Sequence, residues 1–234
     1  MKLATLRDRS RDGRLVVVSR DLTLCSDARH LAPTLQAALD DWDAIAAELA
    51  LIARGLETGG QPTQRLHERD ALAALPRAYN RLDPGRRHGA RTFAAPRASL
   101  ATGPVSAGLA VLTGDLAQGA DSEAARRAIR LVVLICESAG GATLAPAAVT
   151  PDAFAEGALT LDVGGTRLTC EDPIPGLGDL VALAARDRAL AAGCVVAAPA
   201  LIADAPLASS AILRVEMRDT AGHSMFGAIE GGAD

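Results

Sequence analysis

Four short and almost wholly apolar runs constrain the fold of this chain more than any other feature of its sequence. They read RLVVVS, GLAVLTG, RLVVLIC and GCVVAAPA, and they begin at Arg14, Gly108, Arg130 and Gly193. Apolar runs of about four to eight residues bounded by turn residues are typical of buried β-strands. None of them approaches the ~18 to 20 apolar residues that a membrane span needs. The sequence therefore predicts a soluble globule built around buried strands.

The composition narrows the classes of function. Hydrophobic residues make up 49% of the 234-residue chain but aromatic residues only 2%, so the core has to be built from Ala, Val and Leu, and base stacking has few residues to use. The 24 basic and 28 acidic residues give a formal charge of -4 without a long basic tract. We therefore expect no nucleic-acid partner. The N-terminal MKLATLRDRSRDGR lacks the apolar stretch of a signal peptide, so we expect a cytoplasmic protein that does not bind membranes.

The first part of the chain predicts a hairpin followed by a helix. Met1–Leu6 and Arg14–Ser19 are β-like runs that turn at Asp12-Gly13. Thr34 can cap a helix that starts at Leu35 and has Gly55 near its end. Its apolar residues recur at helical spacing and predict one buried face: Leu35, Ala38, Leu39, Trp42, Ile45, Ala46, Leu49 and Ile52.

Neither a helical nor a strand-like spacing of apolar residues continues from Glu57 to about Thr102, where Gly, Pro, Arg and His dominate. We interpret this stretch as a linker or a long surface loop.

Regular patterns return with a strand at Val105–Leu112, a short helix capped by Asp121 or Ser122, and a buried strand in LVVLIC. The run ALTLDVGGTRLT predicts a hairpin that turns at Gly164-Gly165. GDLVALAARDRAL predicts an amphipathic helix and AAGCVVAAPAL a buried strand. In the tail, Leu213, Val215 and Met217 alternate with Arg214, Glu216 and Arg218, which predicts the first strand of a terminal hairpin that turns at Asp219–Gly222.

These elements predict an α+β protein. We expect a small N-terminal α+β domain over residues 1–75, a connector over residues 76–104, and a β-rich main domain over residues 105–234. No internal repeat at solenoid spacing is present.

The cysteines and most histidines are scattered. Cys25, Cys136, Cys170 and Cys194 lie far apart and mostly in apolar surroundings, so we expect four reduced, packed thiols and no zinc site. The isolated residues His30, His67 and His223 are expected at the surface or in hairpins.

Several segments together resemble the fumarylacetoacetate hydrolase family, in particular its bacterial two-domain members. They are the opening MKLATLRDRSRDGRLVVVSRDLT, the helix start LAPTLQAALDDW, LPRAY, GLAVLTGD with AIRLVVLICE, and the ending LRVEMRDTAGHSMFGAIE. The resemblance implies that the main domain has the family's mixed β-sandwich or roll fold. It also implies cleavage, decarboxylation or tautomerisation of small 1,3-dicarbonyl and 2-oxo acids, and a homodimer.

The family's metal site is the place where this sequence departs from the resemblance. The family holds a divalent cation with carboxylates, two of them spaced two residues apart on the strand before the TGD turn, where they face the same side. The matching positions here are Ser106 and Gly108, and neither supplies a charged oxygen. A further family carboxylate matches Glu137. We therefore expect no metal and no other cofactor.

The catalytic candidates are few. The family's lysine has no counterpart, because no lysine follows Lys2, and the segment SAGGATLAPAAVT after Glu137 is interpreted as a shortened connector. Glu137 is a candidate general base if it is buried, or else the first exposed residue past a strand. His88 is a candidate proton-transfer group or a solvated loop residue. Arg77 and Tyr79 could contact a substrate carboxylate or pack between the domains.

Two functions remain open from the sequence. One is a diverged, metal-independent hydrolase, decarboxylase or isomerase acting on a small carbonyl substrate in specialised metabolism. The other is a catalytically inactive homologue that serves as a binding or oligomerisation module. A pocket with converging polar groups near Glu137 would favour an enzyme, and a cavity collapsed or filled by side chains would favour the second function.

Overall fold

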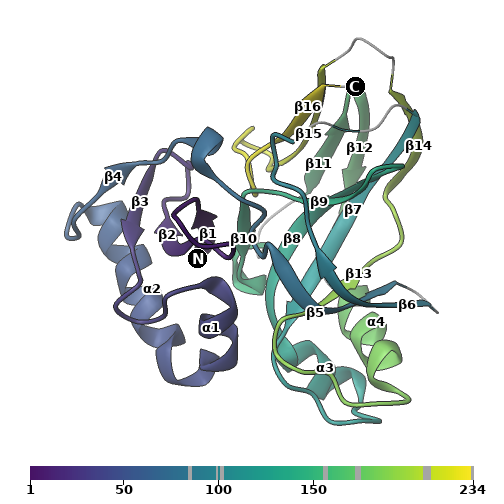
Figure 1. Cartoon of the computed structure of the whole chain (residues 1–234), viewed down its shortest axis with the longest axis horizontal. Coiled ribbons are helices and arrows are strands. Elements are labelled where there is room, and N and C mark those ends of the chain that lie inside the picture. Colours follow the sequence, from purple (N-terminus) through teal and green to yellow (C-terminus); the bar gives the residue numbers. More distant parts are fainter. Residues whose placement is uncertain are drawn as a thin grey trace.

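The chain folds into a mixed α and β structure with one large mixed sheet and one small antiparallel sheet (Figure 1). The computed structural model describes residues 1–83, 86–98, 100, 103–154, 158–171, 175–207 and 212–232. No helix within these ranges is long and apolar enough to cross a membrane. The predicted division into domains at residues 75 and 104 stays a prediction.

The N-terminal hairpin forms as predicted. β1 (Lys2–Leu6) pairs antiparallel with β2 (Arg14–Val18), and Gly13 has a φ of +63°, which favours glycine at that turn. β3 (Leu24–Asp27) and the short β4 (Gln64–Arg65) extend the same sheet.

The predicted long helix is two helices. Thr34 caps α1 (Leu35–Asp40) by accepting a hydrogen bond from the Ala37 amide at 3.2 Å, and α2 (Trp42–Thr58) follows after a break at Asp41. Gly55 lies inside α2, and the helix instead ends at Gly59, whose φ is +73°. Most of the predicted apolar face is buried, and the two helices lie against the N-terminal strands (Figure 1).

The large sheet continues from the N-terminal strands into the rest of the chain through one pairing. β1 pairs antiparallel with β10 (Ala147–Val149), which in turn pairs with β8 (Ile129–Ser138). From β8 the order is β7 (Gly103–Thr113), β13 (Cys194–Ala197), β5 (Arg77–Asp83) and β6 (Arg86–Thr92). β14 (Ile202–Leu207) also pairs with β7, and β9 (Gly141–Leu144) pairs with β8.

Two predicted irregular segments are wrong. The stretch expected as a linker or surface loop contains β4, the 3-10 helix η1 (Glu68–Asp70), β5 and β6. The segment after Glu137 was expected as a plain connector, but it supplies β9 and β10. Both differences arise because hydrogen-bonded pairing with a neighbouring strand can stabilise a polar or glycine-rich sequence as a strand.

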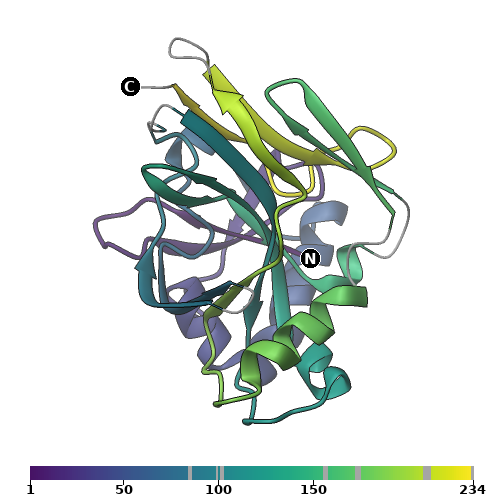
Figure 2. The same ribbon diagram turned by 90° about the vertical axis from the view of Figure 1, so that its right-hand side faces the viewer.

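The small sheet has the order β12 (Thr166–Cys170), β11 (Leu159–Val163), β15 (Ile212–Arg218) and β16 (Ile229–Gly232), and Figures 1 and 2 place it at the end of the molecule opposite the two helices α3 and α4. Gly164 and Gly165 have φ values of +57° and +96°, so the predicted tight turn between β11 and β12 is confirmed. The predicted alternation along β15 also holds, except that Glu216 is only 5% exposed because Arg214 and Arg218 both pair with it.

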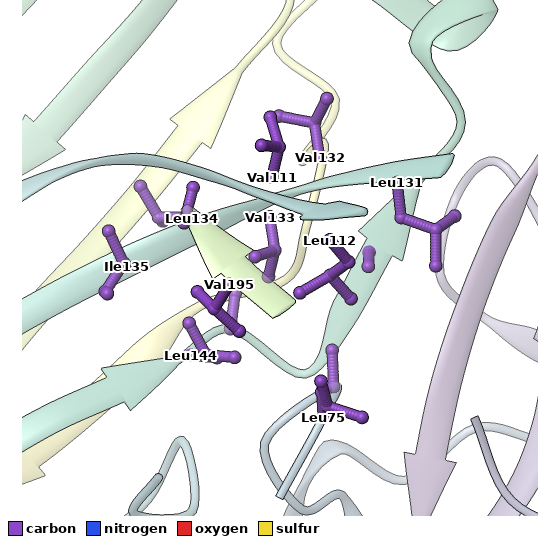
Figure 3. Packing of buried hydrophobic residues seen from close by; sticks show 14 of the residues in the cluster. Leu75, Val111, Leu112, Leu131, Val132, Val133, Leu134, Ile135, Leu144 and Val195 are labelled. Carbon is purple, nitrogen blue, oxygen red and sulfur yellow. The ribbon is translucent and has the colours of Figure 1, made fainter. Parts of the chain in front are cut away.

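The core is built from aliphatic side chains, as the composition requires. Side chains from β7, β8, β9 and β13 meet in its centre, where Leu112, Val133 and Val195 have no exposed surface (Figure 3). The helices α3 (Ser122–Ala128) and α4 (Pro175–Ala185) pack on each other, and the 3-10 helix η2 (Pro151–Phe154) follows β10. The Asp121 carboxylate caps α3 by accepting from the Ala124 amide at 2.7 Å. β7 and β8 are adjacent strands in the interior of the large sheet.

Candidate functional site

The positions that the sequence compares with metal ligands lie on adjacent central strands. Ser106 and Gly108 belong to β7, and their partners on β8 are Glu137 and Ile135. Ser106 is half-buried and Gly108 is buried. The register therefore brings Ser106 and Glu137 side by side, as the resemblance implies.

A backbone segment lies directly over Gly108. The Ala198 amide donates to the Leu109 carbonyl at 2.8 Å, and the Leu201 amide donates to the Ala107 carbonyl at 2.9 Å, so residues 198–201 are tied to β7 on both sides of Gly108. A Cβ atom added at Gly108 would lie 3.2 Å from the Ala200 Cα and 3.3 Å from the Leu201 nitrogen. There is no room at this position for a larger side chain unless the segment moves.

Ser106 forms a hydrogen bond with Asp204, which follows the covering segment in the chain. Its Oγ accepts a hydrogen bond from the Asp204 amide at 3.2 Å. Asp204 has a φ of +53° and lies where the pairing of β14 with β7 shifts register between Ile202 and Ala205. Ser106 thus satisfies a backbone donor in an irregular strand, which is a structural role.

A pocket of about 190 Å³ opens beside these residues. Three of its lining residues are polar, namely Asp83, Ser106 and Glu137. The remaining lining residues are Ala107, Gly108, Ile135, Ala197, Ala198, Pro199 and Ala200. The pocket is therefore small, and its lining consists mostly of short apolar groups together with the carboxylates of Asp83 and Glu137.

Arg81, which the sequence interpretation did not single out, bonds to both carboxylates of the pocket. Its Nε and Nη2 donate to the Asp83 Oδ1 at 3.0 and 2.9 Å, and Nη2 also pairs with the Glu137 Oε1. The Arg81 side chain is only 10% exposed, against 43% for Glu137. Glu137 is thus neither the buried unpaired base nor the freely solvated residue that were considered.

A signal for Arg81 was available in the sequence. In RAYNRLD, the polar residues Arg77, Arg81 and Asp83 occupy alternate positions against Ala78 and Leu82, which is the period of a strand. Arg81 and Asp83 are two residues apart, so their side chains extend from the same face of β5. The partner on β8 could not be read from the local pattern, because β5 and β8 meet only through the tertiary fold.

The residues at this place do not fit the divalent cation that the resemblance implies. A hard cation such as Mg²⁺ needs several oxygen ligands, mainly carboxylates. Ser106 offers a hydroxyl already engaged with Asp204, Gly108 offers none, and the Arg81 guanidinium occupies oxygens of both Asp83 and Glu137. Within the described ranges no group of three or more His, Cys, Asp or Glu residues could hold a metal ion.

Arg77 and Tyr79 lie at the exposed start of β5. The Arg77 guanidinium forms a forked pair with the Asp12 carboxylate in the turn between β1 and β2, and this hydrogen bond holds the pKa of Asp12 below its ordinary value. Tyr79 is 60% exposed. Neither residue lines the pocket beside Glu137. The Arg77 contact corresponds to the alternative of packing between chain segments, and a substrate-binding role stays a prediction.

No histidine or cysteine is among the described residues that line this pocket. The backbone of His88 belongs to β6, but its side chain lies outside the described residues, so its proposed proton-transfer role stays a prediction. His30, His67 and His223 are exposed, as expected. All four cysteines are free thiols, and burial raises the pKa of Cys136 to about 11, which disfavours a thiolate nucleophile there.

A larger groove of about 640 Å³ lies elsewhere on the molecule, near the β4–η1 segment. Arg65, Arg69 and Arg97 contribute to its lining. Arg97 is already paired with Glu68 at 3.4 Å and Glu230 at 3.1 Å. We place the candidate site at the smaller pocket because polar side chains from β5, β7 and β8 converge there.

Comparisons with known proteins concern the N-terminal part of the chain and the overall fold. Residues 1–77 match the model of the family described as fumarylacetoacetase N-terminal domain 2. No curated protein matches the chain by sequence. The whole chain superimposes on solved structures at low sequence identity, so these matches show a shared fold and nothing more.

Two such structures illustrate the likeness. One is the maleylpyruvate hydrolase from Sphingobium sp. SYK-6 in complex with manganese(II) ion and pyruvate, which is 15% identical with a TM-score of 0.71 over 100% of this chain and 99% of that chain. The other is a fumarylacetoacetate hydrolase from psychrophilic Exiguobacterium antarcticum, which is 14% identical with a TM-score of 0.61 over 100% and 99%. The shared fold covers the full length of both proteins.

Proposed function

We propose that this chain, a member of the fumarylacetoacetate hydrolase family by its N-terminal domain and its whole-chain fold, is a catalytically inactive homologue that serves as a binding or oligomerisation module. One observation carries the proposal. Residues 198–201 lie over Gly108 so closely that a Cβ atom added there would lie 3.2 Å from the Ala200 Cα, at a position where the resemblance implies a metal-binding acid.

The energetics of this contact support loss of the site rather than its rearrangement. Two backbone hydrogen bonds fix the covering segment, and each is worth about 1 kcal/mol in folded proteins. A side chain at residue 108 would require this segment to shift. The charged oxygens that a cation needs are thus absent at Ser106 and Gly108, and the space beside Gly108 is tightly filled.

The pocket beside Glu137 supports the same proposal. Its volume of about 190 Å³ is below the ~300 to 1,000 Å³ typical of small-molecule sites. Its ionisable lining groups within the described ranges are two carboxylates, and Arg81 is bound to both of them. A reaction through an enolate needs a positive group or preorganised donors aimed at the developing charge. No such group among the described lining residues is offered to a substrate.

Turnover of acylpyruvates and oxaloacetate by the purified chain tests the proposal. We expect no turnover above the uncatalysed rate, whether Mg²⁺, Mn²⁺ or a chelator is added. A known active family member assayed in parallel controls for the substrates. Turnover that depends on the added metal would refute the proposal.

A second function is favoured by one specific observation, which is that a pocket persists beside Glu137 and gathers Asp83 and Ser106. On this alternative the chain is a metal-independent hydrolase, decarboxylase or isomerase acting on a small 1,3-dicarbonyl or 2-oxo acid in specialised metabolism. Glu137 would transfer the proton after release from Arg81, and His88, Arg77 and Tyr79 would remain candidates for the other roles. Chelator-resistant turnover that Glu137→Gln abolishes would establish this alternative.

Either function is compatible with a homodimer, which we propose only on the family resemblance. Light scattering coupled to size-exclusion chromatography tests it. A single species of twice the 23.9 kDa chain mass is expected, and a monomer would refute it.

A further inference from the structure

The Arg81 guanidinium lies beside the pocket, and neither proposed function explains its place there. It contacts carboxylates from two different strands, Asp83 on its own strand β5 and Glu137 on β8. Its side chain is 10% exposed, whereas those of Asp83 and Glu137 are 24% and 43% exposed. A buried arginine paired with two carboxylates is a built arrangement and differs from an ordinary surface ion pair.

The fold fixes Arg81 at this place. Its backbone is held between β13, where Val195 is its partner, and β6, where Gly89 is its partner at an irregularity in the pairing. Glu137 is held opposite Ser106 in the central pair of strands. The guanidinium therefore links two rigid elements, and it does so beside the pocket where the resemblance places a divalent cation.

We infer that Arg81 is a built-in cation that takes the place of a divalent metal ion, neutralises Glu137 and Asp83, and makes this pocket independent of metals. The chemistry suits the task. A guanidinium is charged at all physiological pH values, and its planar donors match carboxylate oxygens, so it can satisfy two acids at once. A metal ion has to compete for the same oxygens with a cation that the chain itself supplies.

The inference deepens the proposed function, because it concerns the same pocket and rests on the loss of metal chemistry there. It does not depend on whether any reaction remains. Its test measures stability and ion binding, so its failure can be distinguished from the failure of the proposed function, which is tested by turnover.

Chemical rescue tests the inference. Arg81→Ala removes the cation that bridges Glu137 and Asp83, and we expect the unfolding midpoint to fall by roughly 4–8 °C. Guanidinium chloride at about 50 mM, well below denaturing concentrations, is expected to restore at least half of this loss, whereas NaCl and methylammonium chloride at equal ionic strength are not. The wild-type chain, in which the place is filled, is the matched control and should show no increase.

A second variant shows whether the effect depends on charge. Arg81→Ala combined with Glu137→Gln removes the unpaired acid, so this double variant is expected to be more stable than Arg81→Ala and to respond less to guanidinium. If Arg81→Ala does not fold, this double variant is measured instead and is expected to fold.

Three results would overturn the inference. They are an Arg81→Ala protein that is as stable as the wild type, a folded Arg81→Ala protein without a guanidinium response, and a double variant that fails to fold when Arg81→Ala also fails. The last result would mean that Arg81 acts through packing and not through its charge.

Discussion

Gly108→Ala is the sharpest test of the covering segment, because it adds a single carbon atom at the place where the fold leaves no room. The new Cβ would lie 3.2 Å from the Ala200 Cα and 3.3 Å from both the Leu201 nitrogen and the Pro199 oxygen. All three are backbone atoms, so no side-chain rotation relieves the contact. The segment, the strand or both have to shift.

The magnitude follows from this geometry. Overpacking by one carbon in a closely packed region costs about 1–3 kcal/mol. For a chain of 234 residues this corresponds to a lowering of the unfolding midpoint by roughly 3–10 °C. The loss should be accompanied by faster hydrogen exchange at the Ala198 and Leu201 amides, which tie the segment to β7.

The assay compares thermal unfolding and amide exchange of Gly108→Ala with those of Gly176→Ala. The control position lies in α4 with no heavy atom within 4 Å of an added Cβ, so its variant should be as stable as the wild type or slightly more stable. An unchanged midpoint for Gly108→Ala, or unchanged exchange at both amides, would refute the claim that this segment excludes a side chain at residue 108.

Three further variants test other features of the fold. Thr34→Ala removes the cap of α1 and should lower the free energy of unfolding by about 1 kcal/mol in urea titrations, and an unchanged value would contradict the capping role. Burial lowers the pKa of Lys2 from 10.5 to about 8, so the folded state binds fewer protons than the unfolded state between these values, and the free energy of unfolding should rise with pH across that window. Lys2→Met should show a smaller rise between pH 8 and 10. Because the pKa of Asp12 is lowered in the folded state, its pair with Arg77 stabilises the fold above about pH 4, and this stabilisation is lost as the pH falls through the folded pKa. Asp12→Asn should remove the stabilisation and lower the free energy of unfolding by less than about 1 kcal/mol, because half of the Arg77 side chain is exposed.

Most helices and strands could be predicted from local patterns, because their turns and caps depend on residues that are close together in the sequence. The turns at Gly13 and at Gly164-Gly165 need positive φ, and the cap of α1 needs an oxygen at Thr34, so these features could be predicted from a few consecutive residues. The break of the long helix at Asp41 could not, since the apolar spacing continues across it.

The parts that could not be predicted depend on contacts between distant segments. β5 carries Arg77, Asn80, Arg81 and Asp83 and has the composition of a loop, yet it forms a strand because β13 and β6 pair with it on both sides. For the candidate site, the sequence placed Ser106, Gly108 and Glu137 together. The alternation in RAYNRLD indicates that Arg81 and Asp83 share one face of a strand, but it does not reveal that Arg81 meets Glu137, which lies 56 residues later in the chain.

We propose that Glu137 is paired with Arg81 beside this pocket and does not serve as a ligand of a divalent ion. Titration of Mn²⁺ into the wild-type chain and into Glu137→Gln, followed by electron paramagnetic resonance of the free ion, tests it most directly. The account predicts the same weak binding for both proteins. Binding of one Mn²⁺ per chain that Glu137→Gln abolishes would contradict it.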